Sequence, residues 1–201
     1  MKALKQQSGF TLVEMAIVLV IIGILLGGVL KGQEMIESAK IKNVVDQAKS
    51  LSAAIYTYQD KYGVYPGDDD DAKNHLKGGK AGCSATFIQE PATSNGIINY
   101  ADRFRAIQHL ACANLITGSY NGTSDTMKHK YGGVIDLRDG TVPPTGTSQL
   151  SGNQIRFNAL SRSVAAQIDR TLDDGKYNTG SVRGSADYDV AGENVYIAFF
   201  Y

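Results

Sequence analysis

A single carboxylate, Glu14, lies inside an otherwise apolar run that extends from Phe10 to Leu30. A helix of this length rises about 31 Å, which is enough to cross the hydrocarbon core of a bilayer. A charge in lipid is unfavourable, although less so near the end of a span than at its centre. Glu14 is therefore either a tolerated imperfection of a plain anchor or an acid that pairs with a cation after assembly. The free α-amino group of a neighbouring chain is such a cation if the chain is cut before Phe10.

The residues before the run carry a processing mark of an unusual kind. Gly9 is a small residue placed before the apolar run, whereas a secretory signal has its small-residue cleavage site after it. The sequence GFTLVE at residues 9–14 resembles the prepilin motif of type IV pilins and type II secretion pseudopilins, and the apolar helix that follows agrees with it. The resemblance implies cleavage between Gly9 and Phe10 by a prepilin peptidase and N-methylation of the new Phe10 amine. It also implies that Glu14 pairs with the N-terminal amine of an adjacent subunit.

The flanking charges predict how the apolar run is oriented. Lys2 and Lys5 lie on the short N-terminal side, which favours keeping that end in the cytoplasm. Together with the resemblance, this predicts a single-pass inner-membrane precursor with its C-terminal domain in the periplasm. The assembled form is expected in an extracellular or periplasmic filament.

Two cysteines, Cys83 and Cys112, are the only ones in the chain, and no cysteine–histidine cluster suggests zinc. If the domain is exported, the pair can oxidise to a disulfide. Closing a loop of about 30 residues stabilises a domain by roughly 3 kcal/mol on the loop-entropy model. The alternative is a pair of buried free thiols, and we favour the disulfide on condition of export.

Acidic and amide side chains gather in two segments. The four carboxylates of residues 68–71 follow the turn signal Pro66-Gly67, and we interpret them as a solvated loop with a helix cap, because consecutive residues rarely face one ion. A C-terminal segment rich in glycine offers weak candidates for Ca²⁺ ligands, although turn chemistry alone explains its composition. Those candidates are Asp173, Asp174, Asn178, Asp187 and Asp189. No cofactor is expected, with Ca²⁺ the only alternative.

The spacing of apolar residues predicts the elements that position these groups. Residues 41–62 repeat apolar positions at alternating steps of three and four, so the apolar run continues as an amphipathic helix that ends at Gly63. We predict a second helix over residues 100–116 with His109 partly exposed, a hairpin turn at Asp139-Gly140, a helix over 161–172 and a buried final strand over 193–201. The predicted divisions are a leader (1–9), an assembly half of the helix (10–30), its soluble half (31–62) and a globular head (63–201).

The expected fold class is α+β: a long N-terminal spine helix packed on a small antiparallel β-sheet with helical insertions, as in pilins. The balanced charge, 20 basic against 20 acidic residues, gives no clear nucleic-acid signal. No catalytic motif occurs, so an enzyme is not expected.

The function implied by the resemblance is that of a structural subunit of a type IV pilus-like filament. Its partners would be other copies of itself or related pilins, the prepilin peptidase, and the inner membrane before assembly. A pseudopilin of a type II secretion system and a minor tip pilin that acts as a binding module are the alternatives. The large head and the cysteine pair favour a pilus, whereas the absence of a proline near Lys31 favours a pseudopilin.

Overall fold

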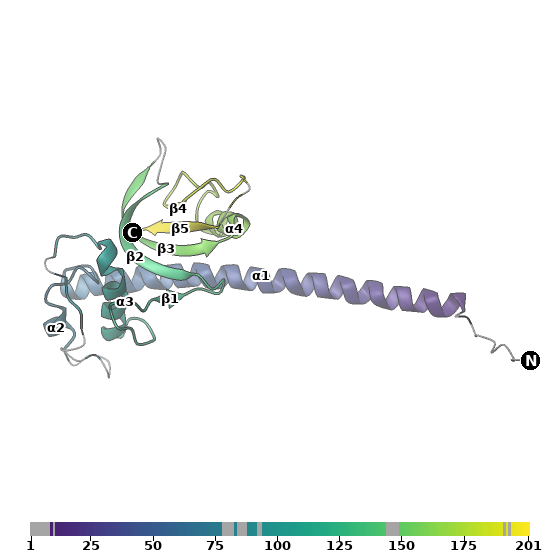
Figure 1. The fold of residues 1–201 in the computed structure, drawn as a ribbon, viewed down its shortest axis with the longest axis horizontal. Helices are drawn as coiled ribbons and strands as arrows, with labels where there is room; N and C mark the ends of the chain where they lie inside the picture. The colour runs from purple at the N-terminus through teal and green to yellow at the C-terminus, as the bar shows by residue number, and fades with distance from the viewer. Residues whose placement is uncertain are drawn as a thin grey trace, which may run out of the picture. The chain divides into compact units, whose positions relative to one another are not determined.

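The computed structural model describes residues 9, 11–77, 83, 88–91, 94–143, 149–190, 192 and 194–201. The chain divides into two compact units, Met1–Ala39 and Lys40–Tyr201. One helix, α1 (Leu12–Tyr62, 51 residues), contributes to both units and confirms the predicted continuous helix (Figure 1). It ends where the sequence predicts: Gly63 takes a φ of 77° and its N–H donates to the Gln59 carbonyl over 2.7 Å. Glycine adopts this left-handed geometry without steric cost, which is why it stops the helix.

The part of α1 in the first unit buries no described side chain. This part contains an 18-residue window with a mean hydropathy of 2.7, and none of that window is buried. Among the described residues, α1 is the helix that is long and apolar enough to cross a membrane. Leu12, Ile24 and Leu30 are each more than 60% exposed. A continuous apolar surface of this size requires cover from lipid or from other chains.

The second unit is built on a five-stranded antiparallel sheet of order β1-β2-β3-β5-β4. The strands are β1 (Met127–Lys128), β2 (Val134–Val142), β3 (Leu150–Leu160), β4 (Val182–Gly184) and β5 (Val195–Phe200). β5 pairs with a strand on each side, as expected of its dense β-branched and aromatic sequence. The α+β pilin-like architecture predicted from the sequence is confirmed.

The core of this unit lies between the sheet and the soluble part of α1, which crosses the sheet in Figure 1. Alternate residues of the three central strands face this core, as the twofold periodicity of a strand dictates. They are Ile135 and Leu137 of β2, Ile155 and Phe157 of β3, and Ile197 and Phe199 of β5. On α1 the buried positions follow the predicted stripe, and they are Ile41, Val44, Val45, Ala48, Leu51, Ala54, Ile55 and Tyr58.

Smaller helices complete the unit, and one of them is shorter than predicted. α2 (Ala72–His75), the 3₁₀ turn η1 (Tyr100–Asp102), α3 (Arg103–Cys112) and α4 (Arg162–Leu172) are observed. The helix expected to reach residue 116 ends at Cys112, because Asn114 takes a left-handed φ of 61°. The Leu115 N–H then donates to the Leu110 carbonyl over 3.0 Å, which closes the last turn.

The hairpin turn predicted at Asp139-Gly140 is wrong. Both residues lie within β2, where Asp139 pairs with Asn153 and Gly140 with Gly152. The glycine serves close packing instead, since the guanidinium of Arg156 occupies the space that a Cβ atom at position 140 would need.

Candidate processing and assembly site

Thr11 and Glu14 form a reciprocal pair at the start of α1. The Thr11 backbone N–H and hydroxyl donate to Glu14 Oε2 over 2.7 and 2.8 Å, and the Glu14 N–H donates to the Thr11 hydroxyl over 3.2 Å. A threonine and a glutamate three positions apart form the capping box of a helix N-terminus, which explains why α1 begins here. The Glu14 carboxylate therefore has local hydrogen bonds in the isolated chain, and it is fully exposed.

Gly9 lies two positions before Thr11 and is exposed. Among the residues that the structure describes, no atom lies within 4 Å of a Cβ atom built at Gly9, and its backbone does not lie in the left-handed region. Neither the described residues nor the backbone geometry requires glycine at this position. Phe10, on the other side of the predicted cleavage bond, lies outside the described residues.

Four further glycines, at positions 23, 27, 28 and 32, resemble Gly9 in this respect. A Cβ atom at any of them would meet nothing within 4 Å, and none has a left-handed φ. Each lies within α1, where glycine weakens a helix by roughly 1 kcal/mol relative to alanine. The fold of a single chain therefore gives no reason for these residues, whereas close packing against other helices in lipid does.

The described cysteines are joined by a disulfide, Cys83–Cys112, and lie 29 positions apart in the sequence. Cys112 is buried at the end of α3, next to the core of the second unit. The bridge therefore ties Cys83 to a buried helix.

Three of the carboxylates that were weak Ca²⁺ candidates, Asp173, Asp174 and Asp187, accept hydrogen bonds within turns. Asp173 accepts from the N–H groups of Ser181 and Val182 over 2.6 and 3.1 Å, and Asp174 accepts from the Lys176 N–H and the Thr179 hydroxyl. Asp187 accepts from the Asp189 N–H over 3.0 Å. Among the described residues, no group of three or more His, Cys, Asp or Glu side chains is placed to hold a metal ion.

Asp169 is a fully buried carboxylate in the same region. It accepts from the Tyr188 hydroxyl and from the Gly175 N–H, both over 3.0 Å. Burial disfavours its charged form and raises the pKa of Asp169 to about 6. These bonds tie the turn after α4 and the segment before β5 to the end of α4.

The interpretation of residues 68–71 as a solvated loop is wrong for the first two. Asp68 and Asp69 are buried. Asp68 accepts from the N–H groups of Asn95 and Gly96 over 3.0 and 2.6 Å, and burial raises the pKa of its carboxyl. Asp69 accepts from the Tyr58 hydroxyl of α1 over 2.6 Å. The acidic run therefore anchors a loop to α1.

His109 is completely buried, contrary to the partial exposure expected from the sequence. Its Nδ1 accepts from the Gly67 N–H over 3.0 Å, so its Nε2 carries the proton and donates to the Gln89 carbonyl over 2.6 Å. Burial lowers the pKa of His109. Both nitrogens are occupied by backbone partners, which makes the residue a connector of loops.

Comparison with known proteins identifies the N-terminal segment. The family model for the prokaryotic N-terminal methylation motif matches residues 4–30, which include Gly9, Phe10 and Glu14. Comparison with curated proteins returns no match, and comparison with solved structures returns none. The chain carries the signature of type IV pilins and pseudopilins, a class of structural proteins, and its long helix and antiparallel sheet have a pilin-like layout.

Proposed function

We propose that this protein is a structural subunit of a type IV pilus-like filament and polymerises through its N-terminal apolar helix. The observation that carries the proposal is an exposed apolar helix that begins with one carboxylate inside a methylation motif. In lipid, Thr11 is the only partner of this carboxylate among the described residues. In a filament, the amine created by cleavage before Phe10 supplies the opposite charge.

The precursor is held in the inner membrane by the first part of α1, with Lys2 and Lys5 on the cytoplasmic side and the head in the periplasm. A prepilin peptidase cuts between Gly9 and Phe10 and the new amine is methylated. Gly9 supports this step, because the fold itself does not need glycine there. A peptidase that accepts only the smallest side chain before the cut accounts for the residue.

The choice of a pilus over a type II secretion pseudopilus rests on the large disulfide-bonded head. A subunit exposed outside the cell benefits from a covalent staple, because no cellular reductant or chaperone maintains it there. Deleting the gene and scoring surface filaments and protein secretion separately tests this choice. Loss of secretion with normal surface filaments would assign the protein to the secretion system.

The decisive experiment separates processing from assembly. Glu14→Ala is expected to be cleaved and methylated normally, as shown by intact mass, and to give at least tenfold fewer sheared filaments. Glu34→Ala is the matched control, since Glu34 is an exposed glutamate on the same helix that pairs with Lys31 over 2.9 Å. A wild-type protein that is not cleaved and still begins at Met1 would refute the proposal. Normal filament yield from Glu14→Ala would refute it as well.

A further inference from the structure

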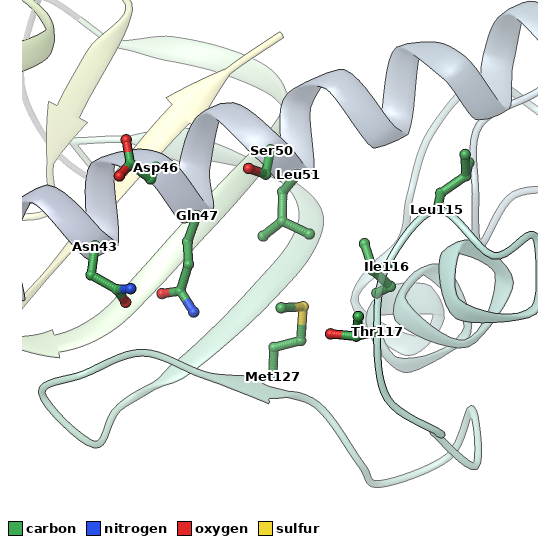
Figure 2. A pocket seen from close by; sticks show the side chains of 9 residues that line it. All are labelled: Asn43, Asp46, Gln47, Ser50, Leu51, Leu115, Ile116, Thr117 and Met127. Atoms are coloured by element: carbon green, nitrogen blue, oxygen red, sulfur yellow. The ribbon is translucent and has the colours of Figure 1, made fainter.

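A groove beside the soluble part of α1 has a volume of about 310 Å³, and Figure 2 shows it between α1, β1 and the segment after α3. Two polar atoms of its α1 wall, Asn43 Oδ1 and Gln47 Oε1, have no hydrogen-bond partner among the described residues, but both are buried from solvent. An incoming side chain does not reach them, so they select no partner. Two other spots on the second unit expose charge and apolar surface together.

The first spot is an arginine patch, made of Tyr100, Arg103, Phe104 and Arg138, where η1 and the start of α3 contact β2. The Arg103 Cζ atom lies 3.7 Å from the centre of the Tyr100 ring and 4.0 Å from that of Phe104. The Arg138 Cζ atom lies 4.8 Å from the centre of the same Tyr100 ring, and this tyrosine is 61% exposed. A guanidinium that stacks on a ring keeps the N–H groups at its edge free to donate in its own plane.

The positive charge of the arginine patch is not balanced within the described part of the chain. Arg103 and Arg138 are both partly exposed, and neither forms an ion pair with a described carboxylate. Asp102, the acid next to Arg103, pairs with Arg105 instead. Asp139 follows Arg138 in β2, so it faces the other side of the sheet. Two guanidinium groups beside one ring repel each other, and a carboxylate at their edges relieves this repulsion.

The second spot is an acidic segment, Asp189–Val190, between β4 and β5. Asp189 is exposed, and its carboxylate has no hydrogen bond or ion pair among the described residues. Val190 is 56% exposed. The preceding residue fixes the segment to the fold, because the Tyr188 hydroxyl donates to buried Asp169 over 3.0 Å. The segment therefore presents a carboxylate beside an apolar side chain.

The two spots lie on different sides of the sheet order. The arginine patch is beside β2, and β3 separates β2 from β5. The acidic segment is bonded to α4, since Arg162 of α4 donates to the Asp187 carbonyl, and α4 packs beside β4 and β5. A contact between two different patches of the same chain is heterologous, and heterologous contacts that do not close a ring build helical filaments.

We propose that the arginine patch of one copy binds the acidic segment of a second copy, an inference that rests on the filament proposed above. The Asp189 carboxylate accepts from the guanidinium edges, and Val190 covers the exposed ring of Tyr100. This charge-assisted contact fixes the orientation of neighbouring heads in addition to the apolar helix packing. The chain has 20 basic and 20 acidic residues, so each copy brings both halves of the contact. A nucleic acid would instead require a broad basic surface.

Reversing the charge on each side of the contact tests the proposal. Arg138→Glu and Asp189→Arg are each expected to lower the yield of sheared filaments about fivefold or more, with processing unchanged, because like charges then face each other. The double variant is expected to give about threefold more filaments than either single variant, since the pair is rebuilt with its members exchanged. Asp125→Arg reverses another exposed acid of the head and is the control, expected neither to lower the yield nor to rescue Arg138→Glu.

Urea midpoints of the purified variants show whether the head still folds. Asp189→Arg is expected to leave the midpoint unchanged, because its carboxylate is exposed and makes no bond among the described residues. It therefore keeps the test valid if Arg138→Glu lowers the midpoint.

Photo-crosslinking identifies the occupant of the arginine patch. Benzoylphenylalanine in place of Tyr100 keeps an aromatic ring at this position in the full chain, and it is expected to give a covalent dimer of this protein in cells. The crosslinked peptide is expected to be the tryptic peptide of residues 184–201, which contains Asp189 and Val190. Thr123, exposed and outside the patch, is the control position. Crosslinks to another protein or to nucleic acid, or no crosslink specific to position 100, would overturn the assignment.

The outcomes separate the two proposals. Normal filament yield from Asp189→Arg, or a loss that the double variant does not restore, would overturn the head contact. With few filaments from Glu14→Ala, the filament proposal would still stand. Normal yield from Glu14→Ala, or an uncleaved wild-type chain, would overturn the filament proposal and the head contact with it.

Discussion

Between Leu12 and Ala39, α1 buries none of its described side chains, whereas between Lys40 and Tyr62 it buries eight. Within the first part, the stretch from Met15 to Leu30 is apolar on every side of the helix. The second part confines its apolar residues to a stripe and places Lys42, Asp46 and Lys49 elsewhere. One continuous helix therefore contains two kinds of surface, although its backbone hydrogen bonding is the same throughout.

This difference shows what stabilises each part. An amphipathic stripe finds its partner within the chain, and here the partner is the sheet. A helix that is apolar all round cannot be covered by one neighbouring element, so its cover comes from outside the chain. Substitutions in the two parts should consequently be detected by different measurements.

The largest effect is expected from a matched pair of leucines. Leu51 is 1% exposed and Leu25 is 62% exposed. Leu51→Ala should lower the free energy of unfolding of the head by about 3 to 5 kcal/mol, because it leaves a cavity in the core. Leu25→Ala should change it by less than about 0.5 kcal/mol.

Urea unfolding of the mature protein in detergent, followed by the near-ultraviolet circular dichroism of tyrosine, measures both variants. All 11 tyrosines lie between Tyr56 and Tyr201, so the signal reports the second unit. Equal losses of unfolding free energy from Leu51→Ala and Leu25→Ala would contradict the difference between the two parts of α1.

Removing the disulfide should also act on the head alone. Replacing Cys83 and Cys112 by serine releases a loop of about 30 residues in the unfolded chain, and we expect a loss of about 3 kcal/mol. Adding reductant to the wild-type protein should lower its urea midpoint about as far as the double substitution does. The urea midpoint of the double variant should not change on adding reductant. A reductant effect on the double variant would assign the loss to another cause.

Two nearby tyrosines of α1 differ in the surroundings of their hydroxyl groups. Tyr58 is fully buried and its hydroxyl donates to Asp69 over 2.6 Å, whereas Tyr56 is 50% exposed. Tyr58→Phe should cost about 1 to 2 kcal/mol, because a buried carboxylate loses a donor. Tyr56→Phe is the control and should be neutral within about 0.5 kcal/mol. Equal urea midpoints for the two variants would contradict the buried Tyr58–Asp69 bond.

The last predicted effect is a change in pH dependence, and it also belongs to the head. The pKa of Asp169 is about 6 in the folded protein and close to 4 when unfolded, so the folded state binds the proton more tightly. The stability that Asp169 contributes is thus fully present below about pH 4 and lost as the pH rises through 6. Wild-type protein should lose stability relative to Asp169→Asn between pH 4.5 and pH 7.5.

Asp174→Asn supplies a control of opposite sign. Hydrogen bonds from Thr179 and Lys176 lower the pKa of Asp174, so its contribution is present at neutral pH and lost on acidification. Urea midpoints at the two pH values measure both differences. A constant difference between wild type and Asp169→Asn would contradict the raised pKa.

Local patterns predicted much of this molecule. The processing motif, the stripe along α1 and the apolar strand β5 each depend on residues close together in the sequence, and a helix or strand repeats such patterns at a fixed period. Thr11 and Glu14 have the spacing of a capping box, so this part of the site was also visible in the sequence, although only the structure revealed the bonds.

Long-range contacts explain what the sequence did not predict. Asp68 is buried because the N–H groups of Asn95 and Gly96 reach it from 27 and 28 positions away. His109 is buried because Gly67, 42 positions away, donates to it. The spacing of apolar residues along one helix cannot indicate hydrogen-bond partners this far away in the sequence. Asn114 is a local signal that was overlooked, since asparagine also adopts the left-handed conformation that ends a helix.

β5 follows the other strands that the structure describes, and it separates β3 from β4 in the sheet. During export in the proposed orientation, β4 crosses the membrane before β5 and has no strand to pair with. Ile197 and Phe199, which complete the core, are synthesised after all the other described strands. The head therefore closes in one late step, and a chain that stops before residue 195 presents two open strand edges to periplasmic proteases. In the filament proposed above, the order of strands thus keeps a chain that lacks β5 from joining as a folded subunit.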